Sequence, residues 1–211
     1  MKKILLIGDS IRLGYDKYVK MAFAGAAEVY YPEENSRFAA YVLRNLPDWK
    51  AQLKCGDDVD LVHWNAGLWD VLTLLDGERL TPIAVYEFYL ERICKLIQHL
   101  FPKAQMIFAT STPVREELFS GYKRYNKDIV AYNDAAAAIV KRYGGEINDL
   151  YALAEGAPGE WHSDMPHYYT KEGTRMLTDQ VIRSIETALD IQSKPLDYDA
   201  LFAATKDALG I

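Results

Sequence analysis

The sequence predicts an α/β domain built on a parallel sheet. Short apolar runs alternate with segments in which apolar residues recur every three or four positions, the pattern of strands connected by helices. The chain has 211 residues, and 50% of them are hydrophobic, which suits one domain with a substantial core. No internal repeat or low-complexity stretch interrupts the alternation.

Five apolar runs are the predicted strands. They span residues 4–7, 27–31, 59–64, 105–110 and 146–153, the last including the exit from its strand. Asp60 should lie near the entry end of the third. Because helical segments separate the strands, we expect their carboxyl ends to meet at one edge of the sheet, where α/β proteins bind ligands.

Helical periodicity covers the segments between the strands. The predicted helices span residues 13–23, 38–46, 82–101, 125–143 and 171–191. Pro47 should end or kink the second of them, with one further turn over residues 48–53. Gly144 and Gly145 should end the fourth.

The third helix has a clear start signal and a predicted buried face. We expect Thr81 to be its N-cap and Pro82 its first helical residue. The predicted face consists of Val85, Tyr89, Ile93, Leu96 and Leu100.

Residues 1–192 should form the domain. Pro195 interrupts the chain after the last long helix, and a short helix is predicted at 199–209. We expect residues 193–211 to be a helical appendage packed on the same domain.

Composition excludes several classes of protein. The net charge of −6 argues against a nucleic-acid partner, which would need a basic face. No apolar run is long enough to span a membrane and no leader is visible, so we expect no membrane partner and a cytoplasmic location. Cys55 and Cys94 form no disulfide framework, and Cys94 falls in a helical apolar pattern typical of a buried residue. The turn from Gly8 to Gly14 fits neither a dinucleotide nor a P-loop motif, so no cofactor is expected.

Gly8-Asp9-Ser10, directly after the first strand, contains the first candidate site residue. Ser10 would lie at the carboxyl end of that strand and near the N-terminus of a helix, where backbone N–H groups favour an anion. Such a serine is more often an ordinary helix cap. A nucleophilic role requires a base and a group that orients the base.

Asp164 and His167, near the other end of the chain, supply those two groups. Pro166 between them favours a loop, in which a carboxylate can hydrogen-bond the imidazole three residues later and fix its tautomer. A loop histidine without a catalytic role is the simpler interpretation of this segment alone. A metal site formed by His162, Asp164 and His167 is a further alternative, which no ligand motif supports.

Two more polar loops follow strands at the same edge. Asn65, after the third strand, can donate a side-chain N–H to an oxyanion, and Gly67 lets the backbone approach a ligand closely. Asn35 and Ser36, after the second strand, could complete an oxyanion hole with backbone N–H groups. An ordinary turn at the first loop and a helix cap at the second are the alternatives.

Together these segments resemble the SGNH hydrolases, the GDSL-type esterase superfamily. Gly8-Asp9-Ser10 is similar to the first sequence block of that family, and Asp164-Met165-Pro166-His167 to the last. Gly67-Leu68-Trp69-Asp70 is less closely similar to the third block, Gly-x-Asn-Asp. The resemblance implies a three-layer α/β/α, flavodoxin-like fold with a five-stranded, mostly parallel sheet. It also implies ester hydrolysis through an acyl-enzyme, with Ser10 as nucleophile, His167 as base and Asp164 as the group that orients it.

The resemblance is incomplete where the family holds the oxyanion. Trp69 occupies the position of the third-block Asn, and the second-block region, Asn35-Ser36-Arg37, has no glycine. Either Asn65 or backbone N–H groups must then hold the oxyanion. The predicted oxyanion and substrate-binding residues are Asp9, Asn35, Ser36, Asn65, Gly67 and Trp69.

We predict a serine esterase that cleaves a small acyl ester, with an acetyl group on a carbohydrate favoured. Aromatic residues near the motifs suit sugar rings, unless they serve in the core: Tyr15, Trp64, Trp69, Trp161, Tyr168 and Tyr169. Arg12 and Arg37 could meet an anionic substrate. The alternatives are a weakly catalytic protein of this fold that binds a carbohydrate or acyl ligand, and a lipase- or thioesterase-like acyl hydrolase.

Overall fold

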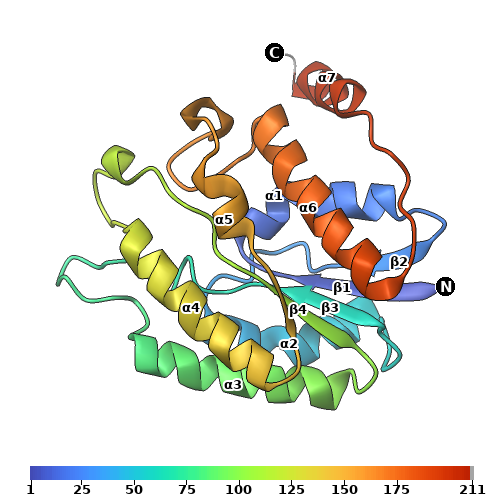
Figure 1. Ribbon diagram of the computed structural model, residues 1–211, viewed down its shortest axis with the longest axis horizontal. Helices are drawn as coiled ribbons and strands as arrows, with labels where there is room; N and C mark the ends of the chain where they lie inside the picture. The colour runs from blue at the N-terminus through green and yellow to red at the C-terminus, as the bar shows by residue number, and fades with distance from the viewer. Residues whose placement is uncertain (210–211) are drawn as a thin grey trace.

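Five strands form one sheet between two layers of helices in the computed structural model, which describes residues 1–209, with side chains for residues 1–203 (Figure 1). The strands are β1 (Lys2–Ile7), β2 (Ala27–Tyr30), β3 (Leu61–Trp64), β4 (Gln105–Ala109) and β5 (Glu146–Asn148). Their order is β2-β1-β3-β4-β5 and every pair is parallel. The predicted three-layer, flavodoxin-like architecture is confirmed.

Each face of the sheet is covered by helices (Figure 1). One layer contains α2 (Ala39–Leu53), α3 (Ile83–Leu100) and α4 (Asn126–Arg142). The other contains α1 (Ser10–Ala22), α5 (Leu150–Glu155) and α6 (Lys171–Leu189). Two short 3-10 helices, η1 (Glu116–Leu118) and η2 (Gly159–Trp161), lie in loops for which no helix was predicted.

The last helix, α7 (Tyr198–Leu209), follows an extended segment. The Phe202 ring stacks on the ring of Tyr18 in α1, with 6.0 Å between the centroids. The end of the predicted appendage, residues 210–211, lies outside the described residues, and the domain boundary at residue 192 stays a prediction.

Pro47 does not end the second helix. It lies inside α2, and the turn predicted for residues 48–53 is continuous with the residues before it. Leu46 and Trp49, next to the proline, are both buried in the core. Tertiary packing therefore holds the helix through a residue that cannot donate a backbone hydrogen bond.

The buried face of α3 differs from the predicted one. The helix begins one residue later than expected, with Pro82 as N-cap instead of Thr81, and Val85 is 40% exposed. Tyr86 is buried instead, because its hydroxyl donates to the Ala66 carbonyl oxygen at 2.8 Å. The buried residues of α3 are Tyr86, Leu90, Ile93, Cys94 and Ile97.

The loops after β1, β2 and β3 are tied together at the carboxyl edge. The Asn65 N–H donates to the Ile7 carbonyl at 3.0 Å, and the Ser36 N–H donates to the Gly8 carbonyl at 3.0 Å. The strand order reverses between β1 and β3, the position where open α/β sheets bind ligands. Ser10 and Asn65 follow these two strands directly.

A fully buried arginine joins α1 to the loop after β2. Arg12 forms an ion pair with Asp16, one helical turn later, and its guanidinium also donates to the carbonyls of Gly8 and Glu34. Because its side chain is 0% exposed, the prediction that Arg12 could meet an anionic substrate is wrong. Its role is to hold the polypeptide on both sides of the Ser10 turn.

Arg12→Met should lower the free energy of unfolding by about 3–5 kcal/mol, because Asp16 and two carbonyl oxygens would lose their buried donor. Arg44→Met is the matched control. Arg44 pairs with Asp48 at the same spacing, but their side chains are 72% and 50% exposed, so the loss should stay below about 1 kcal/mol. Urea unfolding measures both values, and equal losses would contradict this role of Arg12.

Candidate active site

Ser10 is the first residue of α1. Asp9 is the N-cap, and its Oδ1 accepts a hydrogen bond from the Ile11 N–H at 2.9 Å. The sequence alone favoured Ser10 as the helix cap, whereas in the structure the cap is Asp9, one residue earlier. Because the N–H groups of a first helical turn have no acceptor within the helix, the N-terminus of α1 attracts negative charge beside the Ser10 hydroxyl.

Asp164 and His167 form a hydrogen-bonded pair in the loop before α6. Both carboxylate oxygens of Asp164 lie 2.8 Å from His167 Nδ1, and Oδ1 also accepts from the His167 backbone N–H at 3.0 Å. A carboxylate can only accept, so Nδ1 carries the proton and Nε2 is left with a lone pair. Nε2 is buried and has no hydrogen-bond partner in the described structure.

Tyr169 joins the two ends of the chain. Its hydroxyl donates to the Ser10 carbonyl oxygen, and its ring stacks on the His167 imidazole with 4.6 Å between centroids and 17° between planes. The ring also lies against Gly14 of α1, where an added Cβ would lie 2.7 Å from the tyrosine ring. The ring is therefore confined, and it holds the imidazole next to the start of α1.

The loop that contains His167 is closely tied to the body of the protein. The Ser163 N–H donates to the His167 carbonyl at 2.8 Å, and the Arg115 N–H donates to the Met165 carbonyl at 2.9 Å. Thr170 caps α6, and a Cβ on Gly173 would lie 2.5 Å from the Trp161 carbonyl oxygen. The position of His167 is thus set by backbone contacts around it.

Asp9 and Asn65 are both buried beside the Gly8-Asp9-Ser10 turn. Burial raises the pKa of Asp9, while hydrogen bonds from the Asn65 side chain and the Ile11 N–H, and the charges of Arg124 and His167, oppose that rise. An added Cβ on Gly8 would lie 1.9 Å from Asn65 Oδ1, so only glycine fits there. Asn65 therefore lies at the site, and its buried Oδ1 has no hydrogen-bond partner among the described residues.

In the second-block region, the backbone N–H groups of Ser36 and Arg37 form hydrogen bonds within the protein. The Ser36 N–H donates to Gly8, Ser36 Oγ accepts from the Gly8 N–H, and Asn35 Oδ1 accepts from the Arg37 N–H at 2.8 Å. Arg37 has a φ of +52°, the left-handed conformation that favours glycine. The backbone thus adopts a glycine-like turn here without a glycine.

The third-block loop is anchored by a buried carboxylate. Gly67 has a φ of +137°, and an added Cβ would lie 3.0 Å from the Tyr86 hydroxyl, so a larger residue would not fit. Trp69 is partly buried. Asp70 is fully buried and accepts from the Ala39 N–H at the start of α2, which ties this loop to the second-block loop.

Of the six aromatic residues that were predicted to suit a sugar ring, only three are not buried. Tyr15, Trp64 and Tyr168 are buried in the core, so they offer no face to a sugar. Trp69 and Trp161 are partly exposed, and Tyr169 is 39% exposed.

His162 does not join Asp164 and His167 in a metal site. Its ring packs on Tyr168, with 3.9 Å between centroids. No group of three or more His, Cys, Asp or Glu side chains in residues 1–203 is arranged to hold a metal ion. None of the described helices is long and apolar enough to cross a membrane.

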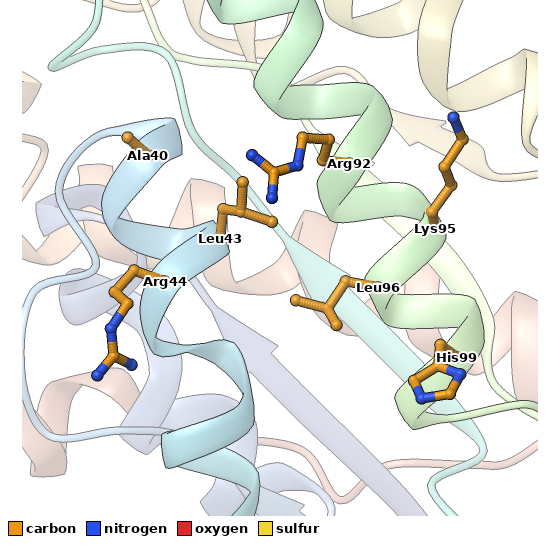
Figure 2. A pocket seen from close by; sticks show the side chains of 7 residues that line it. All are labelled: Ala40, Leu43, Arg44, Arg92, Lys95, Leu96 and His99. Carbon is orange, nitrogen blue, oxygen red and sulfur yellow. The ribbon is translucent and has the colours of Figure 1, made fainter.

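A cavity of about 610 Å³ lies away from these residues, in the groove between α2 and α3 (Figure 2). Its lining consists of Ala40, Leu43, Arg44, Arg92, Lys95, Leu96 and His99. Figure 2 shows that Arg92 reaches over the groove toward Leu43, whereas Arg44 and Lys95 point away from it. The cations do not converge on a common point, and no candidate site residue lines this groove.

Two residues that the sequence did not single out lie in the site region. Asp70 was noted only as the end of the third block. Arg124 lies in the loop between η1 and α4, and its Nε donates to the Leu68 carbonyl oxygen. This loop follows β4, so its position after a strand end could have indicated from the sequence that it lies at the same edge as the other motifs.

Solved structures of hydrolases share this architecture. A lipase/acylhydrolase from Enterococcus faecalis matches with a TM-score of 0.72 over 93% of this chain and 100% of that chain, at 21% identity. An acetyl xylan esterase matches with a TM-score of 0.70 over 87% of this chain and 99% of that chain, at 16% identity. The chain has the fold of the SGNH hydrolases.

A GDSL-like lipase from Bacteroides thetaiotaomicron has the same SGNH fold, with a TM-score of 0.67, 18% identity and 89% of each chain covered. No protein-family model matches the sequence, and no curated protein is significantly similar to it. At identities this low the likeness establishes the fold, and the roles of individual residues rest on their geometry.

Tyr169→Ala should lower kcat for ester hydrolysis by about tenfold to a hundredfold, because the imidazole would lose the ring that holds it near Ser10. Tyr169→Phe keeps the stacked ring and loses only the hydroxyl, so its loss should be clearly smaller. The kinetics of the two variants, with thermal unfolding as a control for folding, test this. Equal losses in both would contradict a positioning role for the ring.

Burial raises the pKa of Asp70 to about 6, against hydrogen bonds from Thr81 and Ala39. The folded state therefore binds this proton more tightly than the unfolded state, and the free energy of unfolding should fall as pH rises from about 4 to 6. The contribution is on the order of 3 kcal/mol. Asp70→Asn should remove that part of the pH dependence, whereas Asp48→Asn, at an exposed site, should keep the wild-type slope.

Proposed function

We propose that this protein is a serine esterase that hydrolyses short acyl esters through an acyl-enzyme. One observation carries the proposal: His167 has Asp164 on Nδ1 and an unpartnered Nε2, and Tyr169, which stacks on the His167 ring, donates its hydroxyl to the Ser10 carbonyl. The SGNH-like fold, shared with lipases and acylhydrolases, supports it.

Acylation begins when the Ser10 hydroxyl attacks the ester carbonyl. His167 Nε2 takes the hydroxyl proton as the Oγ–C bond forms, and Asp164 stabilises the imidazolium. The carbonyl oxygen becomes an oxyanion near the N-terminus of α1, where the Ser10 N–H favours negative charge. Collapse of the intermediate expels the alcohol, which receives its proton from His167.

Deacylation repeats these steps with water. His167 takes a proton from the water molecule as its oxygen attacks the acyl carbonyl, and it returns a proton to Ser10 when the carboxylic acid leaves. The same imidazole therefore serves as base and acid in both halves of the reaction.

A short acyl group, with acetyl favoured, is the proposed substrate class. The partly exposed rings of Trp69, Trp161 and Tyr169 offer a restricted aromatic surface that suits a sugar bearing the acyl group. The fold likeness to an acetyl xylan esterase is in keeping with this choice. Comparison of kcat/KM for acetylated xylo-oligosaccharides and for p-nitrophenyl esters of increasing chain length tests it.

Ser10→Ala should reduce turnover of p-nitrophenyl acetate by at least about a thousandfold, because no nucleophile remains. Ser120→Ala, at an exposed serine outside the site, is the control and should keep wild-type activity. His167→Ala should cost as much as Ser10→Ala, and the double variant should lose no more than either, because the two groups act as a unit. Additive losses would contradict a Ser10–His167 mechanism.

A binding protein of the same fold is the competing function, favoured by the Trp69 substitution. It predicts wild-type turnover no faster than that of Ser10→Ala, together with retained ligand binding in both. That result would overturn the esterase.

A further inference from the structure

Beside the Ser10 N–H, two donors that the family resemblance would supply for the oxyanion are missing or already used. Trp69 stands at the third-block position, and its indole replaces an amide. The N–H groups of Ser36 and Arg37 are already bonded to Gly8 and Asn35. Removal of one oxyanion donor typically raises the barrier by about 2.7–4 kcal/mol, so another group should supply this stabilisation.

Arg124 is fixed beside the third-block loop. The backbone of Lys123 pairs with that of Thr73 through two hydrogen bonds, of 2.8 and 3.3 Å, in an antiparallel bridge. The next side chain reaches back across this loop, where Arg124 Nε donates to the Leu68 carbonyl. Leu68 directly precedes Trp69, so the guanidinium lies at the position in the chain where the amide is missing.

The guanidinium is partly buried and has donors to spare. Among the described residues Arg124 donates one hydrogen bond, from Nε to the Leu68 carbonyl, and its guanidinium lies 5.9 Å from the centroid of the Phe119 ring, which leaves Nη1 and Nη2 without a hydrogen-bond acceptor. The positive charge of Arg124 lowers the pKa of Asp9, the residue before Ser10. The charge of His167 lowers the pKa of the same carboxyl group. The charges of Arg124 and His167 thus both act on the carboxylate next to Ser10, and the contact with Leu68 places Arg124 on the third-block loop.

We propose that Arg124 is a catalytic residue that stabilises the oxyanion formed at Ser10, in place of the amide that Trp69 replaces. This rests on the proposed esterase function. An arginine remains protonated at any working pH and donates in a planar fork. A charged donor forms a stronger hydrogen bond than a neutral amide, and more so in a site from which water is excluded.

Arg124→Met should lower kcat by about a hundredfold to a thousandfold for p-nitrophenyl acetate and for the anionic ester p-nitrophenyl hemisuccinate alike, with little change in KM. Arg124→Lys keeps the charge and should recover part of kcat. Lys127→Met is the control: it removes an exposed cation three residues further on, at the start of α4, and should leave turnover of both esters unaffected.

A second variant keeps the test independent of folding. Adding Trp69→Asn to Arg124→Met restores an amide next to Leu68, and kcat should rise above that of Arg124→Met alone. Urea unfolding of each variant identifies any loss of structure.

Three results would overturn the inference. A loss confined to the hemisuccinate ester, seen mainly in KM, would make Arg124 a substrate-binding residue; an unchanged kcat would remove it from catalysis. Failure of Trp69→Asn to improve the folded Arg124→Met enzyme would separate Arg124 from the missing amide. A wild type whose turnover equals that of Ser10→Ala would instead overturn the esterase itself, and this inference with it.

Discussion

The contact of Tyr169 with Ser10 and His167 holds the candidate site together, because the two segments that form it come from opposite ends of the chain. Its hydroxyl bonds the Ser10 carbonyl while its ring stacks on the imidazole. The ring fits only because Gly14 leaves room for it on α1. The parallel sheet brings the strand ends to one edge, and this side chain joins that edge to the loop before α6.

Buried charge at the same edge sets its electrostatics. Arg12 holds the turn around Ser10 from below, and Asp70 ties the third-block loop to α2. Asp9 is buried directly before the proposed nucleophile in the chain, and the charges of Arg124 and His167 act on its carboxylate. These groups give the site a fixed arrangement of charges before substrate enters, which is how an enzyme stabilises an oxyanion without reorganising at the moment of reaction.

The sequence was sufficient for the fold and for the hydrogen bond between Asp164 and His167, because both depend on local patterns. Strand and helix periodicity located all five strands, and the Asp-x-x-His loop is visible within four residues. What the sequence could not supply were facts about partners distant in the chain. From the sequence, Arg12 could be a substrate contact, but in the structure it is buried against Asp16. Tyr86, whose hydroxyl bonds the Ala66 carbonyl, is buried in α3 where Val85 was expected. The position of Arg124 at the site is visible only from its hydrogen bond to Leu68.

Identification of the residue that reacts with a fluorophosphonate distinguishes Ser10 from every other nucleophile in the protein. We expect one adduct by intact mass, on the peptide that contains Ser10, with labelling strongly slowed in His167→Ala. An adduct on another serine, such as the buried Ser111 near Gly67, or labelling at an unchanged rate in His167→Ala, would contradict it.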